Sequence, residues 1–287
     1  MTLKEIKFGA HIFIWIERWT NAGLPLFERA KALGLDCMDI SIGDDIEFDE
    51  ALVRKEAERM NMELFISPGN LWPMEADLSL PGNETGKAAL DWHKKWISRG
   101  AAAGITVYSG ALYGHPGNIL KARPDPDEHK RICERLHIMA EHAASEGVRI
   151  VLEPMSHFRT HVANNAKQLL SLIEGTRHDN LYVLMDTYHM ITEIKDFGAS
   201  IRLLNDKLYC LHACENDRGA PGGGYVPWDE ICTALKDINF NRYVVFESYN
   251  SSIRNGDFAY SRGMFHNVCP DGDAFVRNSI DFLKAKL

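Results

Sequence analysis

Short, almost continuously apolar segments alternate along the chain with longer segments in which apolar residues recur every three or four positions. The short segments, such as RIVLE, YVLMD and YVVFE, are typical of parallel strands that are buried on both faces. We expect eight strands, at residues 7–13, 36–41, 63–67, 106–111, 149–153, 182–186, 208–213 and 243–248.

The longer segments have the periodicity of amphipathic helices, which place one apolar face against a core. Several begin with Asp, Asn or Pro and end near a glycine, as capped helices do. We expect helices at residues 24–34, 49–61, 84–103, 127–145, 165–175, 197–205, 226–238 and 273–287.

The alternation of eight strands and eight helices over 287 residues predicts a single (β/α)8 TIM barrel, with residues 1–287 as one domain. An open doubly wound sheet is the alternative. It is less favoured because no glycine-rich dinucleotide fingerprint follows the first strand. No long linker rich in Ser, Pro or Gly divides the chain.

Four consecutive predicted strands end in side chains that can bind a metal ion: Glu153, Asp186, His212 and Glu247. The carboxyl ends of barrel strands carry the chemistry of this fold. A buried carboxylate is costly unless it is paired or bound to a metal, so four such strand ends in succession favour a metal site. Three carboxylates and one imidazole suit Mn²⁺, Co²⁺ or Mg²⁺ and leave room for two substrate oxygens.

Further polar and aromatic residues fall at the same predicted rim. His189 follows the sixth strand in a loop, and Arg218 lies in a glycine-rich stretch after the seventh. Because rim loops carry binding residues, both are candidates for substrate contact. His115 follows the fourth strand and Ser67 ends the third, whereas Phe13 could wall a pocket or pack in the core.

Charge and composition narrow the class of protein. The chain has 32 basic and 40 acidic residues, which argues against a nucleic-acid-binding surface. Its apolar runs are far shorter than the ~18 residues of a membrane span, and the first residues lack the order of a signal peptide. The six cysteines form no Cys-x-x-Cys pair, which is typical of reduced thiols. We therefore expect a cytoplasmic protein without nucleic-acid or membrane partners.

The stretches VLEPMSHF, LMDTYHM, LHACENDRGAPGGGYVPWDEICTALKDI and VVFESYN are specific when taken together. With them the chain resembles the xylose-isomerase-like TIM barrels, and within these the D-tagatose 3-epimerase and D-psicose 3-epimerase group of ketose 3-epimerases. The resemblance implies a ketose 3-epimerase that uses Mn²⁺ or Co²⁺ and forms a homodimer or homotetramer. It also implies that Glu153 and Glu247 are both metal ligands and acid/base residues, and that His189 and Arg218 contact the sugar.

These roles agree with the chemistry of a ketose. The C3 proton is weakly acidic, and a divalent ion on O2 and O3 would stabilise the cis-enediolate left by its removal. Inversion needs two bases on opposite faces: one carboxylate removes the proton and the other returns one.

The chain departs from the family's pattern at His157 and Arg159, where the epimerases carry an arginine and a second glutamate. It also departs near His115, where they carry a tryptophan. Such cations could pair with local acids or could bind a carboxylate or phosphate of the substrate. The local acids are Asp44, Asp45 and Glu215. The substrate-binding candidates are therefore His189, Arg218, His115, Ser67, His157, Arg159 and Phe13.

Other functions stay open. The same site could run another enediolate reaction on an acidic or 3-oxo sugar, namely aldose–ketose isomerisation, decarboxylation of a 3-oxo sugar acid or cleavage of a 3-oxo-glycoside. An AP-endonuclease-like nuclease shares the barrel but needs a richer metal cluster and a basic surface. A non-catalytic sugar-binding protein would not need two bases. The segment 251–273, with Arg254, Arg262 and His266, could form a lid, a subunit contact or part of the pocket.

Overall fold

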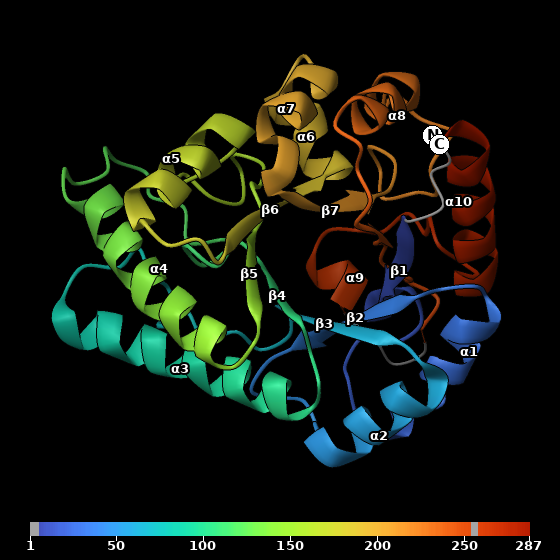
Figure 1. The fold of residues 1–287 in the computed structure, drawn as a ribbon, viewed down its shortest axis with the longest axis horizontal. Coiled ribbons are helices and arrows are strands. Elements are labelled where there is room, and N and C mark those ends of the chain that lie inside the picture. The colour runs from blue at the N-terminus through green and yellow to red at the C-terminus, as the bar shows by residue number, and fades with distance from the viewer. Residues whose placement is uncertain (1–5, 254–257) are drawn as a thin grey trace.

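A computed structural model describes residues 6–253 and 258–287. Eight parallel strands close into a barrel in sequence order, because β1 pairs with β2 on one side and with β8 on the other (Figure 1). This confirms the predicted (β/α)8 fold. The strands are β1 (Lys7–His11), β2 (Cys37–Ile42), β3 (Glu63–Pro68), β4 (Val107–Gly110), β5 (Arg149–Leu152), β6 (Leu181–Asp186), β7 (Leu208–Ala213) and β8 (Tyr243–Phe246).

Helices surround the barrel, and all eight predicted helices are present (Figure 1). Several begin at a side-chain cap, as at Asp49 and Asn165, whose side chains accept hydrogen bonds from the first helical turn. None of the described helices has the length and apolarity that a bilayer crossing requires. The helices are α1 (Leu26–Ala32), α2 (Glu50–Met60), α3 (Asn83–Ala102), α4 (Glu128–Ser145), α5 (Ala166–Thr176), α6 (Thr187–Glu193), α7 (Phe197–Leu204), α8 (Trp228–Asp237), α9 (Phe258–Ser261) and α10 (Gly272–Lys286).

Two short helices, α6 and α9, were not predicted. Helix α6 begins directly after β6, because the side chain of Asp186 caps it by accepting a hydrogen bond from the Tyr188 N–H. His189 therefore lies on a helix, and its placement in a loop was wrong. Helix α9 lies within the ring of outer helices, where the Phe258 ring packs 3.7 Å from that of Phe13 (Figure 1).

The barrel interior has its own apolar layer, which is separate from the larger core between strands and helices. One residue from each of seven strands contributes to it, together with tyrosines at the amino ends of strands. The strand residues are Cys37, Phe65, Val107, Val151, Leu184, Cys210 and Val245, and the tyrosines are Tyr209 and Tyr243. In β1 the corresponding position is Gly9, where a side chain would overlap Cys37.

Side chains two positions apart on a strand point to the same face. Moving two residues on from each interior residue therefore reaches a second layer, nearer the carboxyl ends of the strands. In every strand that residue is polar, and all of them except Ser67 are buried. The layer consists of His11, Asp39, Ser67, Ser109, Glu153, Asp186, His212 and Glu247. The side chains of the barrel interior thus change from apolar to polar over two residues of each strand.

The close approach of β1 and β2 can be tested at Gly9. A Cβ there would overlap the Cys37 sulfur and lie 3.0 Å from the Cys37 carbonyl oxygen. We expect Gly9→Ala to lower the free energy of unfolding by about 1–3 kcal/mol, the usual cost of overpacking. Urea unfolding would measure it, with Gly223→Ala as the control, because a Cβ at Gly223 meets no atom within 4 Å. Equal stability of the two variants would contradict this packing.

Candidate active site

A cavity of about 430 Å³ opens at the carboxyl ends of the strands. This is the size range of small-molecule sites. Its floor is the polar layer: His11, Ser67, Ser109, Glu153, His212 and Glu247 line it. Loops and the start of α6 build the walls, with aromatic side chains of Phe13, Trp72, Tyr188 and Tyr249. The alternation of the strands thus places carboxylates and imidazoles at the bottom of a walled cavity.

The four predicted metal ligands come together in the floor. Glu153, Asp186 and His212 each offer one ligand atom within 4.8 Å of the others. The fourth, Glu247, lies with Oε2 3.2 Å from His212 Nδ1. Carboxylate oxygens and an imidazole nitrogen are suitable donors for a divalent cation. Three buried carboxylates in one cluster also call for positive charge, so the residues present fit such an ion.

A second carboxylate lies behind His212. Asp39 Oδ2 is 3.8 Å from His212 Nε2, and among the described residues neither atom has a hydrogen-bond partner. A carboxylate on this side favours the tautomer with the proton on Nε2. The lone pair of Nδ1 would then face Glu153, Asp186 and Glu247. Asp39 is therefore suited to orient His212 as a ligand.

Asp39 is itself held by a chain of polar contacts. The Ser67 hydroxyl donates a hydrogen bond of 2.9 Å to Asp39 Oδ1, and His11 Nε2 lies 3.4 Å from the Ser67 oxygen. The Phe13 N–H donates to His11 Nδ1, so a neutral His11 carries its proton on Nε2, toward Ser67. Sequence reasoning assigned Ser67 and Phe13 to substrate contact. Both line the cavity, and Ser67 also belongs to this support beneath His212.

The two glutamates of the floor have opposite electrostatic surroundings. Burial, together with the Asp186 charge, raises the pKa of Glu153 to about 8. Burial also opposes ionisation of Glu247, but the Arg218 cation and the His212 hydrogen bond lower its pKa well below its ordinary value. Near neutral pH the metal-free cluster therefore pairs a protonated Glu153 with an ionised Glu247. A metal ion that binds Glu153 would displace its proton.

The pKa of His212, the imidazole of this cluster, is shifted by charged groups of the same site. Burial lowers the pKa of His212, but the Glu247 hydrogen bond and the surrounding carboxylates overcome this effect and raise the pKa to about 9. In the absence of a metal, His212 thus supplies positive charge to the carboxylates of the cluster.

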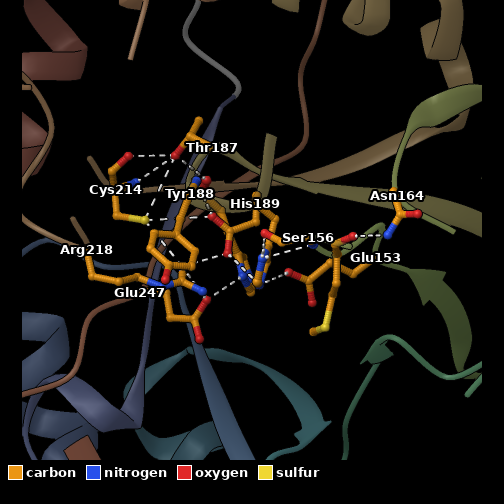
Figure 2. Close-up of polar contacts among 12 residues, drawn as sticks. Glu153, Ser156, Asn164, Thr187, Tyr188, His189, Cys214, Arg218 and Glu247 are labelled. Carbon is orange, nitrogen blue, oxygen red and sulfur yellow. Dashed lines mark hydrogen bonds and ion pairs between the residues drawn. The ribbon is translucent and has the colours of Figure 1, made fainter. Parts of the chain in front are cut away.

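Arg218 supplies the fixed cation of the cluster. Its Nη1 lies 2.6 Å from Asp186 Oδ2 and 3.0 Å from Glu247 Oε2, and its side chain is only 2% exposed. The guanidinium carbon stacks 4.2 Å from the centre of the Tyr188 ring. Figure 2 shows Arg218 beside Glu247, with Glu153 on the other side of the cluster. Arg218 lines the cavity, but its main contacts here are with two predicted ligands.

His189 faces the cluster from helix α6. Its Nδ1 accepts hydrogen bonds from the Ser156 N–H and hydroxyl, at 3.3 and 2.9 Å. Burial lowers its pKa to about 4, so the ring is neutral near pH 7 and carries its proton on Nε2. This nitrogen lies 3.9 Å from Asp186 Oδ2 and 4.0 Å from Glu153 Oε1 (Figure 2). His189 can therefore donate a hydrogen bond into the cavity.

The remaining candidates separate into two groups. His115 lines the cavity beside Trp72, and Arg159 and Arg262 line it nearer the surrounding loops. His157 is not brought to the cavity: its side chain is 70% exposed and its Nδ1 lies 2.7 Å from Glu193. His266 is exposed and is not among the lining residues, and Arg254 lies outside the described residues.

Sequence reasoning missed three residues of the floor: His11, Asp39 and Ser109. Each lies two positions after an interior residue of its strand, so the period of two would have found them once one interior residue per strand was known. In β2 the sequence CMDISI is buried throughout, which hid Asp39 among apolar neighbours.

Comparisons with known proteins agree with this geometry. A relative from Agrobacterium fabrum, named D-psicose 3-epimerase, is 27% identical, with 85% of each chain covered. An L-ribulose 3-epimerase from Mesorhizobium japonicum is 26% identical, over 96% of this chain and 93% of that one. The solved structure of an L-ribulose 3-epimerase superposes with a TM-score of 0.90 at 26% identity, over 98% of this chain and 94% of that one. The Xylose isomerase-like TIM barrel family model matches residues 27–285, and the chain belongs to this family.

Proposed function

We propose that the protein is a metal-dependent ketose 3-epimerase. The observation that carries this proposal is the pair Glu153 and Glu247. Both are buried in the floor of one cavity, and they follow β5 and β8. The names of the relatives point to the same reaction. A pure sugar-binding protein would have no use for two carboxyl groups poised in this way.

The cluster of Glu153, Asp186, His212 and Glu247 would hold the cation, which we propose to be Mn²⁺, with Co²⁺ or Mg²⁺ as alternatives. When bound, such an ion polarises the oxygens of a ketose and makes the neighbouring C–H bond more acidic.

The protein's own groups would then move the proton. Strands β6 and β7 separate β5 from β8 in the closed barrel, so the two glutamates approach a bound sugar from different sides (Figure 2). One carboxylate accepts the C3 proton, and the other carboxyl group donates a proton to the opposite face. His189 Nε2–H is placed to donate a hydrogen bond to a sugar oxygen. Arg218 pairs with Asp186 and keeps Glu247 ionised.

A second candidate is a different enediolate reaction on an acidic or 3-oxo sugar. The observation that favours it is Arg159 in the cavity wall, which suits an acidic substrate. The homodimer or homotetramer and the cytoplasmic location stay predictions.

Deuterium exchange tests the reaction and the two bases. In D₂O with Mn²⁺, we expect a ketose substrate to gain deuterium at C3 and to yield its C3 epimer, as seen by proton NMR. Glu153→Gln and Glu247→Gln should each lower the rate of inversion by about 10²–10⁴-fold, because each removes one acid/base group. Each variant should still exchange the C3 proton of the one epimer that its remaining base can reach.

Glu134→Gln serves as the control, because Glu134 is exposed on α4, and bound manganese is measured in every variant. Formation of CO₂ or an aldose would move the function to the second candidate. Absence of exchange with every ketose, in protein that contains metal, would contradict the proposal.

Asp39→Asn tests the support of the metal centre. Loss of the carboxylate behind His212 removes the partner that favours a lone pair on Nδ1, and such partners usually change metal affinity by about 10–100-fold. We expect Mn²⁺ affinity to fall by that amount in calorimetric titration. Asp77→Asn, a buried aspartate bonded to Ser79 and Asn118, should leave the affinity unchanged. Equal affinities in both variants would show that Asp39 does not position His212.

A further inference from the structure

Two arginines in the cavity wall have no task in the proposed proton transfer. Arg159 lies in the segment between β5 and α5, and Arg262 follows α9. Both line the cavity together with Phe158 and Met264. Each is partly buried, so each guanidinium has given up part of its hydration.

Arg262 is held in place by neutral groups. Its Nη2 donates a hydrogen bond of 2.9 Å to the Gly69 carbonyl, and its guanidinium carbon lies 3.3 Å from the centre of the Phe258 ring. Burial lowers its pKa, and the nearby charge of Arg159 lowers it further although Tyr249 opposes this. Among the described residues, no carboxylate forms an ion pair with Arg262. Burial and the charge of Arg159 outweigh the opposing effects of Tyr249 and of the Glu247 charge.

The guanidinium of Arg159 is less engaged. Its backbone accepts a hydrogen bond from Gly117 and donates one to Ser156, but its side chain bonds to no residue within the described ranges. Its charge acts on groups inside the cavity, because it lowers the pKa of both His189 and Arg262. All five of its N–H donors are thus available to a ligand.

The acids that could have neutralised these arginines are used elsewhere. Asp44 pairs with Lys95 at 2.7 Å, and Asp45 pairs with Arg18 at 2.9 Å. Glu215 is buried and accepts hydrogen bonds from the backbone of the following loop and from the indole N–H of Trp228 at the start of α8. Within residues 6–253 and 258–287, pairing with these acids therefore does not account for the positive charge of the wall.

The floor and the wall of the cavity differ in charge. In the floor, the four carboxylates of Asp39, Glu153, Asp186 and Glu247 would face the three positive charges of Arg218 and a divalent cation. In the wall, neither Arg159 nor Arg262 forms an ion pair with a carboxylate of the described residues, although the Glu247 charge attracts Arg262. A neutral ketose would leave both guanidiniums unpaired in a partly dehydrated site. A phosphate or carboxylate would accept charge-assisted hydrogen bonds from them.

We propose that the substrate is a ketose with an anionic group, a phosphate or a carboxylate, which Arg159 and Arg262 bind in the wall of the cavity. The ketose part rests on the proposed function. The anion-binding part rests on the two arginines.

Binding of unreactive polyols tests the anion site separately from catalysis, because a polyol has no carbonyl group to enolise. Calorimetry on the Mn²⁺-loaded protein compares sorbitol with sorbitol 6-phosphate and with gluconate. We expect one anionic polyol to bind about 10-fold or more tighter than sorbitol, as charge-assisted bonds allow. The anion that gains identifies the group as phosphate or carboxylate.

Arg159→Gln and Arg262→Gln should each reduce the ratio of anionic to neutral affinity by about 10-fold. Arg202→Gln is the control, because Arg202 pairs with Asp237 on the surface and should keep the wild-type ratio. A preference that comes only from chelation at the metal would persist in both wall variants and would overturn the proposal. Tight binding of sorbitol equal to that of both anions would also overturn it.

Turnover of a free ketose, its phosphate and a keto acid is then compared in the deuterium-exchange assay, as the ratio of kcat/KM for the anionic and the neutral substrates. We expect Arg159→Gln and Arg262→Gln to lose the preference for the anionic substrate mainly because KM for this substrate rises. Equal kcat/KM for neutral and anionic ketoses would reject the anion site and leave the epimerase proposal standing. A selective anion site in the polyol titrations without exchange of any ketose would reject the epimerase proposal and support the site.

Discussion

The active site depends on how side chains alternate along eight parallel strands. One interior position of each strand is apolar or glycine, and the next position on the same face is polar. The polar layer therefore lies directly above apolar side chains that exclude water. Charges in such a place require compensation. Ser67 donates to Asp39, and Arg218 pairs with Asp186 and Glu247, whereas Glu153 Oε1 lies 4.0 Å from Nε2 of the neutral His189.

This uneven compensation makes the two glutamates chemically different. Arg218 lies against Glu247 and not against Glu153, so one carboxyl group stays ionised while burial raises the pKa of the other. In the metal-free protein, Glu153 therefore holds a proton near neutral pH while Glu247 does not. A metal ion that binds Glu153 would displace this proton. The position of one buried arginine thus sets the difference between the two carboxyl groups before a metal ion binds.

The sequence could predict the positions of residues that follow from the alternation of side chains along a strand. It could not predict positions that depend on tertiary contacts. Glu153, Asp186, His212 and Glu247 each end an apolar run, so their meeting at one rim follows from the barrel itself. Helix α6 was missed because its N-terminal cap is the predicted ligand Asp186. In the loop after β5, nothing periodic distinguishes His157 from Arg159. A contact with Glu193 on α6 holds His157 outside, and Arg159 lines the cavity.

The floor and the wall of the cavity are built by different parts of the chain, so proton transfer and substrate selection depend on different residues. Strand register fixes the floor, where a change moves the proposed metal ligands and bases together. The wall is built by loops: the Phe258 ring and the Gly69 carbonyl hold Arg262, and Arg159 lies in a loop that contacts Gly117. Loops tolerate substitution better than barrel strands. A family with one floor can therefore select different ketoses, because the charge of the wall can change while the proton-transfer geometry stays fixed.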